Sequence, residues 1–371
     1  MTYHILIVED DATMIESLKS AFNRLLGQCE VNSCGFANAA ERIAETLPDV
    51  VVLDIFEDQV EGISVDAVEA PWCYIWDQHF CPVVFHSAHV VAQYQSLSHP
   101  FIRYELKDPG SLERVANHIQ SFAPEIEGLR AVRRELAQRA GETLRHVSKL
   151  VWQPGKPAAE QADLFLRVVR RRMAAALDHG AMHEEKIQAW EQYIYPSIGE
   201  DLLTGDLIRA TSGDQNDPQS YHLVLSPSCD LVLGQGPNEQ VLVADCVPVD
   251  EYLEKAKVDS QKLNSSKHRE KLGSELTKDQ VAGLTVLPMF PGLLPLMAAN
   301  LKKLSLLPYT DIATKKDETK LFTRITSVDS PFRERLAWAY LQVAGRPGVP
   351  DVDVEALAEA IAQTIRPNAK A

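Results

Sequence analysis

Short apolar segments that alternate with helical patterns limit what the first 120 residues can form more than any other feature of the chain. Three of these segments are His4–Val8, Val50–Leu53 and Pro82–Phe85, and Ile102–Leu106 is a fourth. Apolar runs of this length are typical of parallel strands that are buried on both faces. We therefore predict a parallel β-sheet in this part of the chain.

Helical patterns occupy the stretches between these strands. Thr13–Leu26 and Ser111–Phe122 have apolar residues at helical spacing, and Ser111 is a plausible N-cap for the second helix. Strands that alternate with helices predict an α/β fold with a doubly wound parallel sheet. In such sheets ligands bind at the carboxyl ends of the strands.

Residues able to carry chemistry stand at those strand ends. Glu9 and Asp10 follow the first strand, Asp54 the second, Ser87 the third and Lys107 the fourth. Parallel strands would bring all five to one rim, where three carboxylates need a cation such as Mg²⁺. The metal and Lys107 would neutralise phosphoryl oxygens, Ser87 would donate a hydrogen bond, and Asp54 would be the in-line nucleophile.

These positions together resemble the receiver domain of response regulators, over about residues 3–122. The matching segments are ILIVEDDATM with Glu9 and Asp10, VVVLDI with Asp54, Gly62, PVVFHSA with Ser87 and Ala88, and Tyr104 before Lys107. The resemblance implies a flavodoxin-like fold and a phosphoacceptor at Asp54, with Ser87 and Tyr104 as switch residues. It also implies Mg²⁺ held by Glu9, Asp10, Asp54 and the carbonyl of Phe56, and a histidine kinase as partner.

The chain departs from the receiver pattern in three places. Proline follows Lys107 only after Asp108, the loop 55–61 lacks the usual proline, and Ala70–Cys81 is unusually aromatic where an ordinary amphipathic helix is expected. Receivers with such unusual middles are similar to those of bacterial conflict systems, encoded beside a histidine-kinase-like ATPase.

The middle of the chain is predicted to be helical. Helices are expected over 124–152, 158–179 and 181–195, with Gly128 and Gly141 inside the first. A hairpin of two long helices seldom buries its whole apolar stripe, so we expect a homodimer through these helices. Arginines at 130, 133, 134, 167 and 170–172 would suit nucleic acid or an acidic partner, but a solvated helix face is the favoured interpretation. No helix-turn-helix is legible.

The last part changes character. Segments 205–211, 221–225, 240–247 and 322–325 are strand-like, and 331–343 and 354–365 are helical, which indicates an α+β domain. Residues 281–300 lack formal charge over a length that could span a bilayer. Because Pro288, Pro291 and Pro295 interrupt this stretch, we expect a buried turn and helix and no membrane span.

Charge and cysteine content narrow the class of protein further. Residues 1–120 hold 18 acidic against 6 basic residues, a net of −12 within a chain total of −15. That part should repel nucleic acid and attract divalent cations. The six cysteines show no metal-ligand spacing and the first residues no signal-peptide pattern, so free thiols and a cytoplasmic location are expected.

The predicted organisation is a receiver at 1–123, a helical linker or dimerisation segment at 124–198 and an α+β output domain at 199–371. The predicted function is a response regulator that relays phosphorylation of Asp54 to this output domain, in which we identify no catalytic site. Two alternatives stay open. A faint similarity of 205–207 and 223–230 to RNA-cleaving toxin barrels would make Arg209, Ser226, Ser228 or Asp230 part of a nuclease-like effector. The receiver would otherwise be an unphosphorylated scaffold for a partner ATPase.

Overall fold

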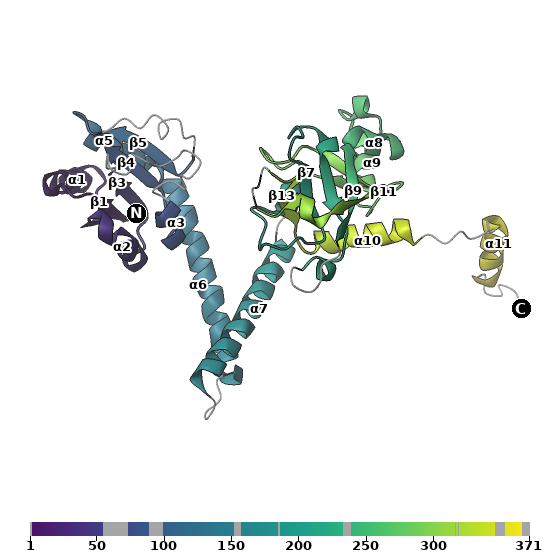
Figure 1. Ribbon diagram of the computed structural model, residues 1–371, viewed down its shortest axis with the longest axis horizontal. Coiled ribbons are helices and arrows are strands. Elements are labelled where there is room, and N and C mark those ends of the chain that lie inside the picture. The colour runs from purple at the N-terminus through teal and green to yellow at the C-terminus, as the bar shows by residue number, and fades with distance from the viewer. Residues whose placement is uncertain are drawn as a thin grey trace, which may run out of the picture. The chain divides into compact units, whose positions relative to one another are not determined.

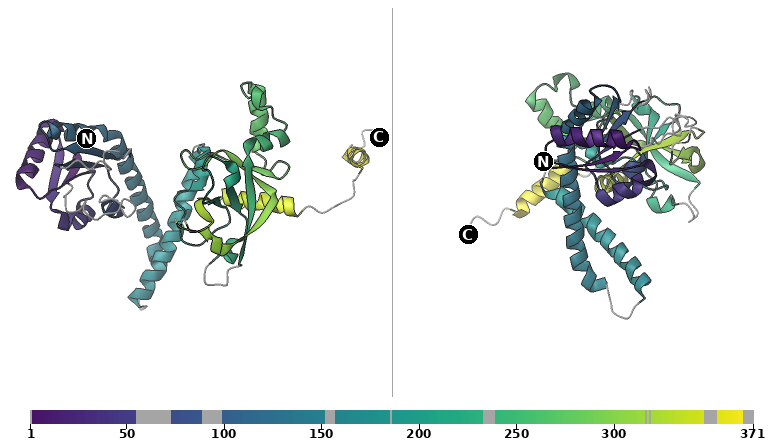
Figure 2. Two further views of the ribbon diagram at one scale, coloured as in Figure 1. Left: turned by 45° about the horizontal axis from the view of Figure 1, so that its top comes forward. Right: turned by 90° about the vertical axis from the view of Figure 1, so that its left-hand side faces the viewer.

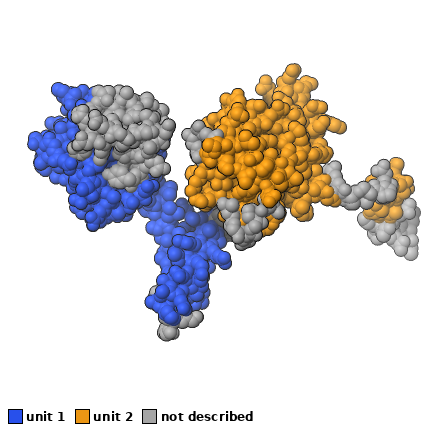
Figure 3. All heavy atoms as spheres, in the orientation of Figure 1, with its two compact units in different colours: residues 1–184 blue, residues 185–371 orange. Residues whose placement is uncertain are grey.

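A computed structural model gives the fold of this chain and divides it into two compact units, Met1–Glu184 and Glu185–Ala371 (Figure 3). The structure describes residues 2–54, 73–88, 99–151, 157–184, 186–232, 239–315, 317, 319–345 and 353–365. Each unit has its own sheet and its own hydrophobic core.

The first unit contains the predicted parallel sheet of five strands, in the order β2-β1-β3-β4-β5 (Figure 1). The strands are β1 (Tyr3–Val8), β2 (Cys29–Cys34), β3 (Val50–Leu53), β4 (Val83–Ser87) and β5 (Ile102–Leu106). Every neighbouring pair is parallel, so all five carboxyl ends lie at one edge.

Side chains of the central strands alternate between two apolar layers, as the pleat requires. Ile5 and Ile7 face the layer formed with helices α1 (Ala12–Leu25) and α5 (Ser111–Ser121). Leu6 and Val8 face the layer formed with α2 (Ala39–Thr46) and α3 (Cys73–Gln78). The α/β prediction for this unit is confirmed, and the aromatic stretch around residue 75 still forms a helix there.

The starts of α1 and α5 show how local sequence places the helices. Asp11 caps α1, because its Oδ1 accepts hydrogen bonds from the Thr13 and Met14 amides, which lower the pKa of this carboxyl. The N-cap of α5 is Gly110, at a φ of 90°. Our prediction that Ser111 caps α5 was wrong. Ser111 is the first residue of the helix, and its Oγ lies 3.0 Å from the Nε2 of His86.

Two long helices, α6 (Ala123–Val151) and α7 (Ala158–Glu184), complete the first unit. Gly128 and Gly141 do not break α6, and a Cβ at either position would meet nothing within 4 Å apart from the adjacent backbone of the helix itself. The predicted third helix over 181–195 was wrong beyond Glu184. That stretch contains a short 3₁₀ turn, Ala189–Gln192, and strand β6, Tyr193–Ile194.

Helix α6 is fixed to the amino ends of β1 and β3 by an arginine. Arg130 donates from Nε to Asp49 Oδ1 at 2.7 Å, from Nη2 to the other oxygen of that carboxylate, and to the Thr2 carbonyl at 2.7 Å. Asp49 is buried, and its carboxylate also accepts from the His4 amide at 2.8 Å. One buried carboxylate thus ties α6 to the edge of the sheet that is opposite to the predicted site.

Replacing Arg130 with Ala should lower the free energy of unfolding by about 2–3 kcal/mol, because the buried Asp49 carboxylate would lose its ionic partner. Urea unfolding followed by circular dichroism measures this effect. Arg139→Ala is the control: Arg139 is on the same helix and has only a weak contact with Glu142 at 3.9 Å. Equal stability of the two variants would contradict a structural role for the Arg130–Asp49 pair.

The second unit is built on an eight-stranded sheet of mainly antiparallel strands, ordered β10-β11-β9-β8-β7-β13-β12 with β6 beside β13. Besides β6, its strands are β7 (Asp206–Ala210), β8 (Tyr221–Val224), β9 (Gln240–Pro248), β10 (Leu284–Leu287), β11 (Met297–Pro308), β12 (Ile312–Ala313) and β13 (Phe322–Val328). The predicted strands of this region are confirmed.

Residues 281–300 form a β-hairpin, which corrects the predicted turn and helix. β10 pairs antiparallel with β11, with Leu284 opposite Asn300, and all three prolines fall in the connection between the strands. Proline removes a backbone donor, so it is tolerated in this connection and disfavoured inside the paired strands. No helix in the described part of the chain is long and apolar enough to cross a membrane.

Both faces of the second sheet are covered, and helices pack at its edges. Leu242, Ala244 and Cys246 of β9 face one apolar layer, whereas Val241 and Val243 face another. The unit's helices are α8 (Val249–Lys255), α9 (Ser266–Leu276), α10 (Phe332–Ala344) and α11 (Val354–Ile365). α8 packs on β10 and β11, and α10 packs on β11. In Figure 2 the green segment with α8 and α9 projects from the sheet.

Candidate functional site

The predicted site residues lie at the carboxyl edge of the parallel sheet, on four adjacent strands. Glu9 follows β1, Asp54 follows β3, Ser87 ends β4 and Lys107 follows β5. Backbone hydrogen bonds hold the strand ends in register, from the Asp54 amide to the Val8 carbonyl at 3.0 Å and from the Lys107 amide to the Ser87 carbonyl at 2.8 Å. The strand order thus brings residues that are far apart in the sequence to one place.

A lysine joins two buried carboxylates at the centre of this edge. Lys107 Nζ lies 2.7 Å from Glu9 Oε2 and 2.9 Å from Asp54 Oδ2. The exposed fractions are 4% for the Glu9 side chain, 10% for Asp54 and 14% for Lys107. Burial alone would lower the pKa of Lys107, but its hydrogen bonds to both carboxylates outweigh burial and raise that pKa. Lys107 is therefore charged at neutral pH.

This group keeps an excess of negative charge when all three side chains are ionised. One ammonium faces two carboxylates, and water is largely excluded from them. Buried charges without full compensation are costly. A further cation therefore has a place beside these two carboxylates. The carboxylate oxygens of Glu9 and Asp54 are of the type that Mg²⁺ prefers.

Asp10 is not part of this contact. Its carboxylate is exposed, and its Oδ1 lies 2.5 Å from the position that a Cβ on Gly35 would occupy. Gly35 follows β2, on the opposite side of β1 from Asp54. Because Gly35 has no side chain, Asp10 can lie against its backbone. Asp10 would have to turn away from Gly35 to share a ligand with Glu9 and Asp54.

The donor set therefore fits a hard cation in part. Two of the three predicted carboxylates converge, and no cluster of three or more His, Cys, Asp or Glu side chains among the described residues is arranged to hold a metal ion. The predicted ligand Phe56 and the loop residue Gly62 lie outside the described residues.

The two predicted switch residues occupy neighbouring strands. Ser87 is fully buried at the end of β4. Tyr104 of β5 pairs with Phe85 of β4 and is half-buried against the apolar layer that includes Trp76 and Phe36. The Tyr104 side chain is thus partly exposed while it packs against the core.

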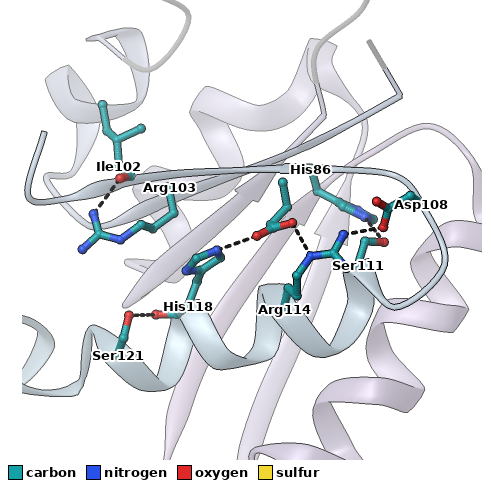
Figure 4. A network of polar contacts seen from close by, with 9 residues as sticks. His86, Ile102, Arg103, Asp108, Ser111, Arg114, His118 and Ser121 are labelled. Carbon is teal, nitrogen blue, oxygen red and sulfur yellow. Dashed lines mark hydrogen bonds and ion pairs between the residues drawn. The ribbon is translucent and has the colours of Figure 1, made fainter. Parts of the chain in front are cut away.

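Sequence reasoning missed a polar network between β5 and α5, shown in Figure 4. Glu105 accepts from Arg114 Nε at 2.7 Å, and its other oxygen lies 2.8 Å from His118 Nε2. Arg114 also pairs with Asp108, directly after Lys107. Alternation along β5 places Glu105 on the side of α5, but its partners depend on how the helix packs.

His86 is a second residue that sequence reasoning missed. Its side chain is buried on β4, beside Ser87, and contacts Ser111 through Nε2, while its Nδ1 has no hydrogen-bond partner. Burial, and next the positive charge of Lys107, lower the pKa of His86 to about 4. His86 is therefore neutral near pH 7 and links the site's strand to α5.

The candidate nuclease residues of the second unit are not brought together. Ser226 Oγ accepts from the Leu242 amide of β9, and Ser228 Oγ accepts from the Thr204 amide in the turn that precedes β7, so both have structural partners. Arg209 lies near the other end of β7. Asp230 contacts the Cys229 thiol at 3.4 Å.

Comparison with solved structures finds similarity to receiver folds. No family model and no curated protein matches the chain. The response regulator domain of Thermotoga maritima CheB is similar at 21% identity, over 35% of this chain and 96% of that chain, with a TM-score of 0.25. A two component transcriptional regulator AraC from Clostridium phytofermentans ISDg is similar at 22% identity, over 35% and 98%, with a TM-score of 0.26. Both similarities cover the N-terminal part alone and concern its fold.

Acid should destabilise the chain partly through His86. The unfolded histidine has a pKa near 6.5, whereas the native pKa is about 4, so between these values only the unfolded state takes up the proton. The free energy of unfolding should fall by about 3 kcal/mol from this group as pH drops through that window.

His86→Gln should remove this part of the acid dependence, which urea unfolding at pH 7, 6, 5 and 4 measures. His146→Gln, at an exposed helical position, is the control and should behave like the unsubstituted chain. The same pH dependence in all three proteins would contradict the assignment.

Proposed function

We propose that this protein is a response regulator whose first unit accepts a phosphoryl group on Asp54. The observation that supports this most is the contact of Lys107 with both Glu9 and Asp54 at the carboxyl edge of a five-stranded parallel sheet. Such an arrangement offers a carboxylate nucleophile, a second carboxylate for a cation and an ammonium for phosphoryl oxygens.

In the proposed reaction, an Asp54 oxygen forms a bond to phosphorus while the bond to the donor's nitrogen or oxygen breaks. The electron pair of that bond and a proton go to the leaving group. Lys107 Nζ, already 2.9 Å from Asp54, would then bind a phosphoryl oxygen, and Ser87 would donate a hydrogen bond to another. Mg²⁺ held by Glu9 and Asp54 would neutralise negative charge on the phosphoryl group. Asp10 and the Phe56 carbonyl are the further proposed ligands.

The donor in this proposal is a histidine kinase or a kinase-like ATPase in the cytoplasm of a bacterium. The signal would pass from Ser87 and Tyr104 to α5 and then into α6, which begins two residues after α5 ends. Allosteric couplings typically supply about 1–3 kcal/mol, which is enough to bias an assembly between two states. The second unit would be the output domain.

We further propose that the protein is a homodimer through α6 and α7. Both helices expose large apolar side chains: Val132, Leu136, Leu144 and Leu150 on α6, and Leu164, Leu166 and Leu177 on α7. Apolar residues at this density on a solvent-facing helix pair are typical of an interface with another helix pair.

Phosphorylation of Asp54 can be tested directly. Incubation with Mg²⁺ and phosphoramidate should add one phosphoryl group, seen by intact-mass spectrometry, and Mg²⁺ with beryllofluoride should raise the thermal unfolding midpoint. Asp54→Asn should abolish both effects, because it removes the nucleophile. Asp77→Asn, at an exposed position of α3, should leave both unchanged.

A Mg²⁺-dependent beryllofluoride effect that survives in Asp54→Asn would contradict the proposed phosphoacceptor. If the unsubstituted chain shows neither effect, the unphosphorylated scaffold is the surviving alternative. Kinase preparations that transfer phosphate to a different residue would also overturn the proposal.

The dimer can be tested by placing charges on α6. Leu136→Glu combined with Leu144→Glu should convert a dimer to a monomer in size-exclusion chromatography with light scattering, because two buried carboxylates per chain would be desolvated. Leu341→Glu is the matched control, since Leu341 is an exposed leucine on α10. A monomeric unsubstituted chain at micromolar concentration would contradict the proposal.

A further inference from the structure

The second unit contains a cavity that none of the proposed functions uses. Its volume is about 540 Å³, and it lies where β7 ends and β13 begins. Cavities that bind small molecules are typically about 300–1,000 Å³. Arg209, Thr211 and Thr323 line it from the two strands, and Lys320 and Leu321 line it from the segment that precedes β13.

Arg209 is the charged group at the centre of this cavity wall. It stands between Tyr221 of β8 and Thr323 of β13 in the sheet register. Its guanidinium carbon lies 6.0 Å from the centre of the Tyr221 ring, and its buried Nε has no hydrogen-bond partner. The Arg209 side chain is hydrogen-bonded to the Tyr221 side chain, and no described carbonyl or carboxylate accepts a hydrogen bond from it.

A second arginine of the same sheet, Arg324, has a structural role and serves as a comparison for Arg209. Arg324 is the next residue after Thr323, on the opposite face, and its terminal nitrogens donate to the carbonyls of Asp201, Gly199 and Thr314. The buried Nε of Arg324 also has no hydrogen-bond partner, so the two arginines differ in their acceptors: Arg324 has three backbone carbonyls, whereas Arg209 contacts the Tyr221 side chain. The unpartnered Nε of Arg209 can donate to an oxyanion without breaking a hydrogen bond of its own.

The hydroxyl groups of two threonines are also part of the cavity lining. Thr211 Oγ1 donates to the Lys320 carbonyl at 2.7 Å and lies 3.3 Å from Thr323 Oγ1. Because the Thr211 proton is already used, the Thr323 hydroxyl is the donor in the contact between the two threonines, and it can turn its proton to a ligand by giving up this long hydrogen bond. Lys320 is held by a hydrogen bond from Nζ to the Thr310 carbonyl.

One carboxylate in the cavity lining would repel a bound anion. Asp317 also lines the cavity, but its Oδ1 accepts from both the amide and the hydroxyl of Thr319. These two hydrogen bonds lower the pKa of Asp317, so it remains charged at neutral pH. Arg209 and Lys320 outnumber it among the described lining residues. Leu321, 63% exposed, adds an apolar wall beside the charged one.

From these groups we infer that the cavity binds a phosphomonoester of mononucleotide size. The phosphate would lie between Arg209 and the Thr323 hydroxyl, and the attached ring system would lie against Leu321. A long nucleic acid is disfavoured as the source of the phosphate, because residues 199–371 hold 24 acidic against 19 basic residues and Asp317 stands at the site.

The inference is tested by isothermal titration of the full chain with inorganic phosphate, AMP and a short oligoribonucleotide. The solutions contain EDTA, so the magnesium-dependent chemistry proposed for the first unit does not contribute. AMP should bind more tightly than phosphate, since only AMP reaches Leu321. Arg209→Met should weaken AMP binding by about tenfold or more, because a charged hydrogen bond is lost.

Further variants separate binding from folding. Arg209→Met should lower the thermal midpoint of the free chain only slightly, since Nε has no partner and the contact with the Tyr221 side chain is what is lost. Thr323→Val should weaken AMP binding, whereas Asp317→Asn should strengthen it about two- to fivefold by removing a repulsive charge while its oxygen still accepts from Thr319. Arg269→Met, at an exposed position of α9, is the control and should bind like the unsubstituted chain.

Failure to bind phosphate or AMP at millimolar concentration would overturn the inference, as would AMP binding that Arg209→Met and Thr323→Val leave unchanged. An oligoribonucleotide that binds more tightly than AMP through Arg209 would overturn the mononucleotide assignment and indicate a nucleic-acid site. A marked loss of stability in Arg209→Met, with Asp317→Asn unchanged in affinity, would indicate a structural arginine.

Discussion

One ammonium group shared by two buried carboxylates is the interaction on which the first unit's proposed chemistry depends. Glu9 and Lys107 are almost a hundred residues apart, and only a parallel sheet with β1, β3, β4 and β5 side by side brings their side chains within 2.7 Å. Lys107 offsets part of the negative charge that Glu9 and Asp54 bring to a place from which water is largely excluded. The same contact leaves room for a cation, because two negative charges are matched by only one positive charge.

The strands and the position of this site could be predicted from the sequence, since apolar runs ending in charged residues define both. The edge strand Cys29–Cys34 could not, because its residues are half-buried and polar side chains alternate with cysteines and valine. The hairpin at 281–300 was mistaken for a turn and helix because an uncharged run with prolines does not distinguish a buried strand pair from a buried helix. The orientation of Asp10 depends on Gly35, at the end of a strand that the sequence did not reveal. Contacts such as those of Glu105, His86 and Arg130 need the packing of helices on the sheet, which periodicity does not specify.

The two units use buried charge in different ways. In the first unit, Asp49, Glu9 and Asp54 all have a basic partner from another element, so charge connects distant segments. In the second unit, Arg324 plays this structural part with Asp206 and backbone carbonyls, whereas no described carbonyl or carboxylate accepts a hydrogen bond from Arg209, whose Nε has no partner. A group whose hydrogen-bonding capacity the fold leaves unused costs stability, and such groups are expected where a protein binds something else.

The attachment of α6 at Arg130 has a mechanical consequence. The helix is anchored at the amino ends of β1 and β3, far from the strand ends that carry the proposed chemistry, and it follows directly from α5. If α5 were displaced, the part of α6 beyond Arg130 would tilt about this anchor. From Arg130 to Val151 that part is about 32 Å long at 1.5 Å per residue. A tilt of about 5° would then move its tip by about 3 Å, so a rigid helix can amplify a sub-ångström adjustment without any change in its own structure.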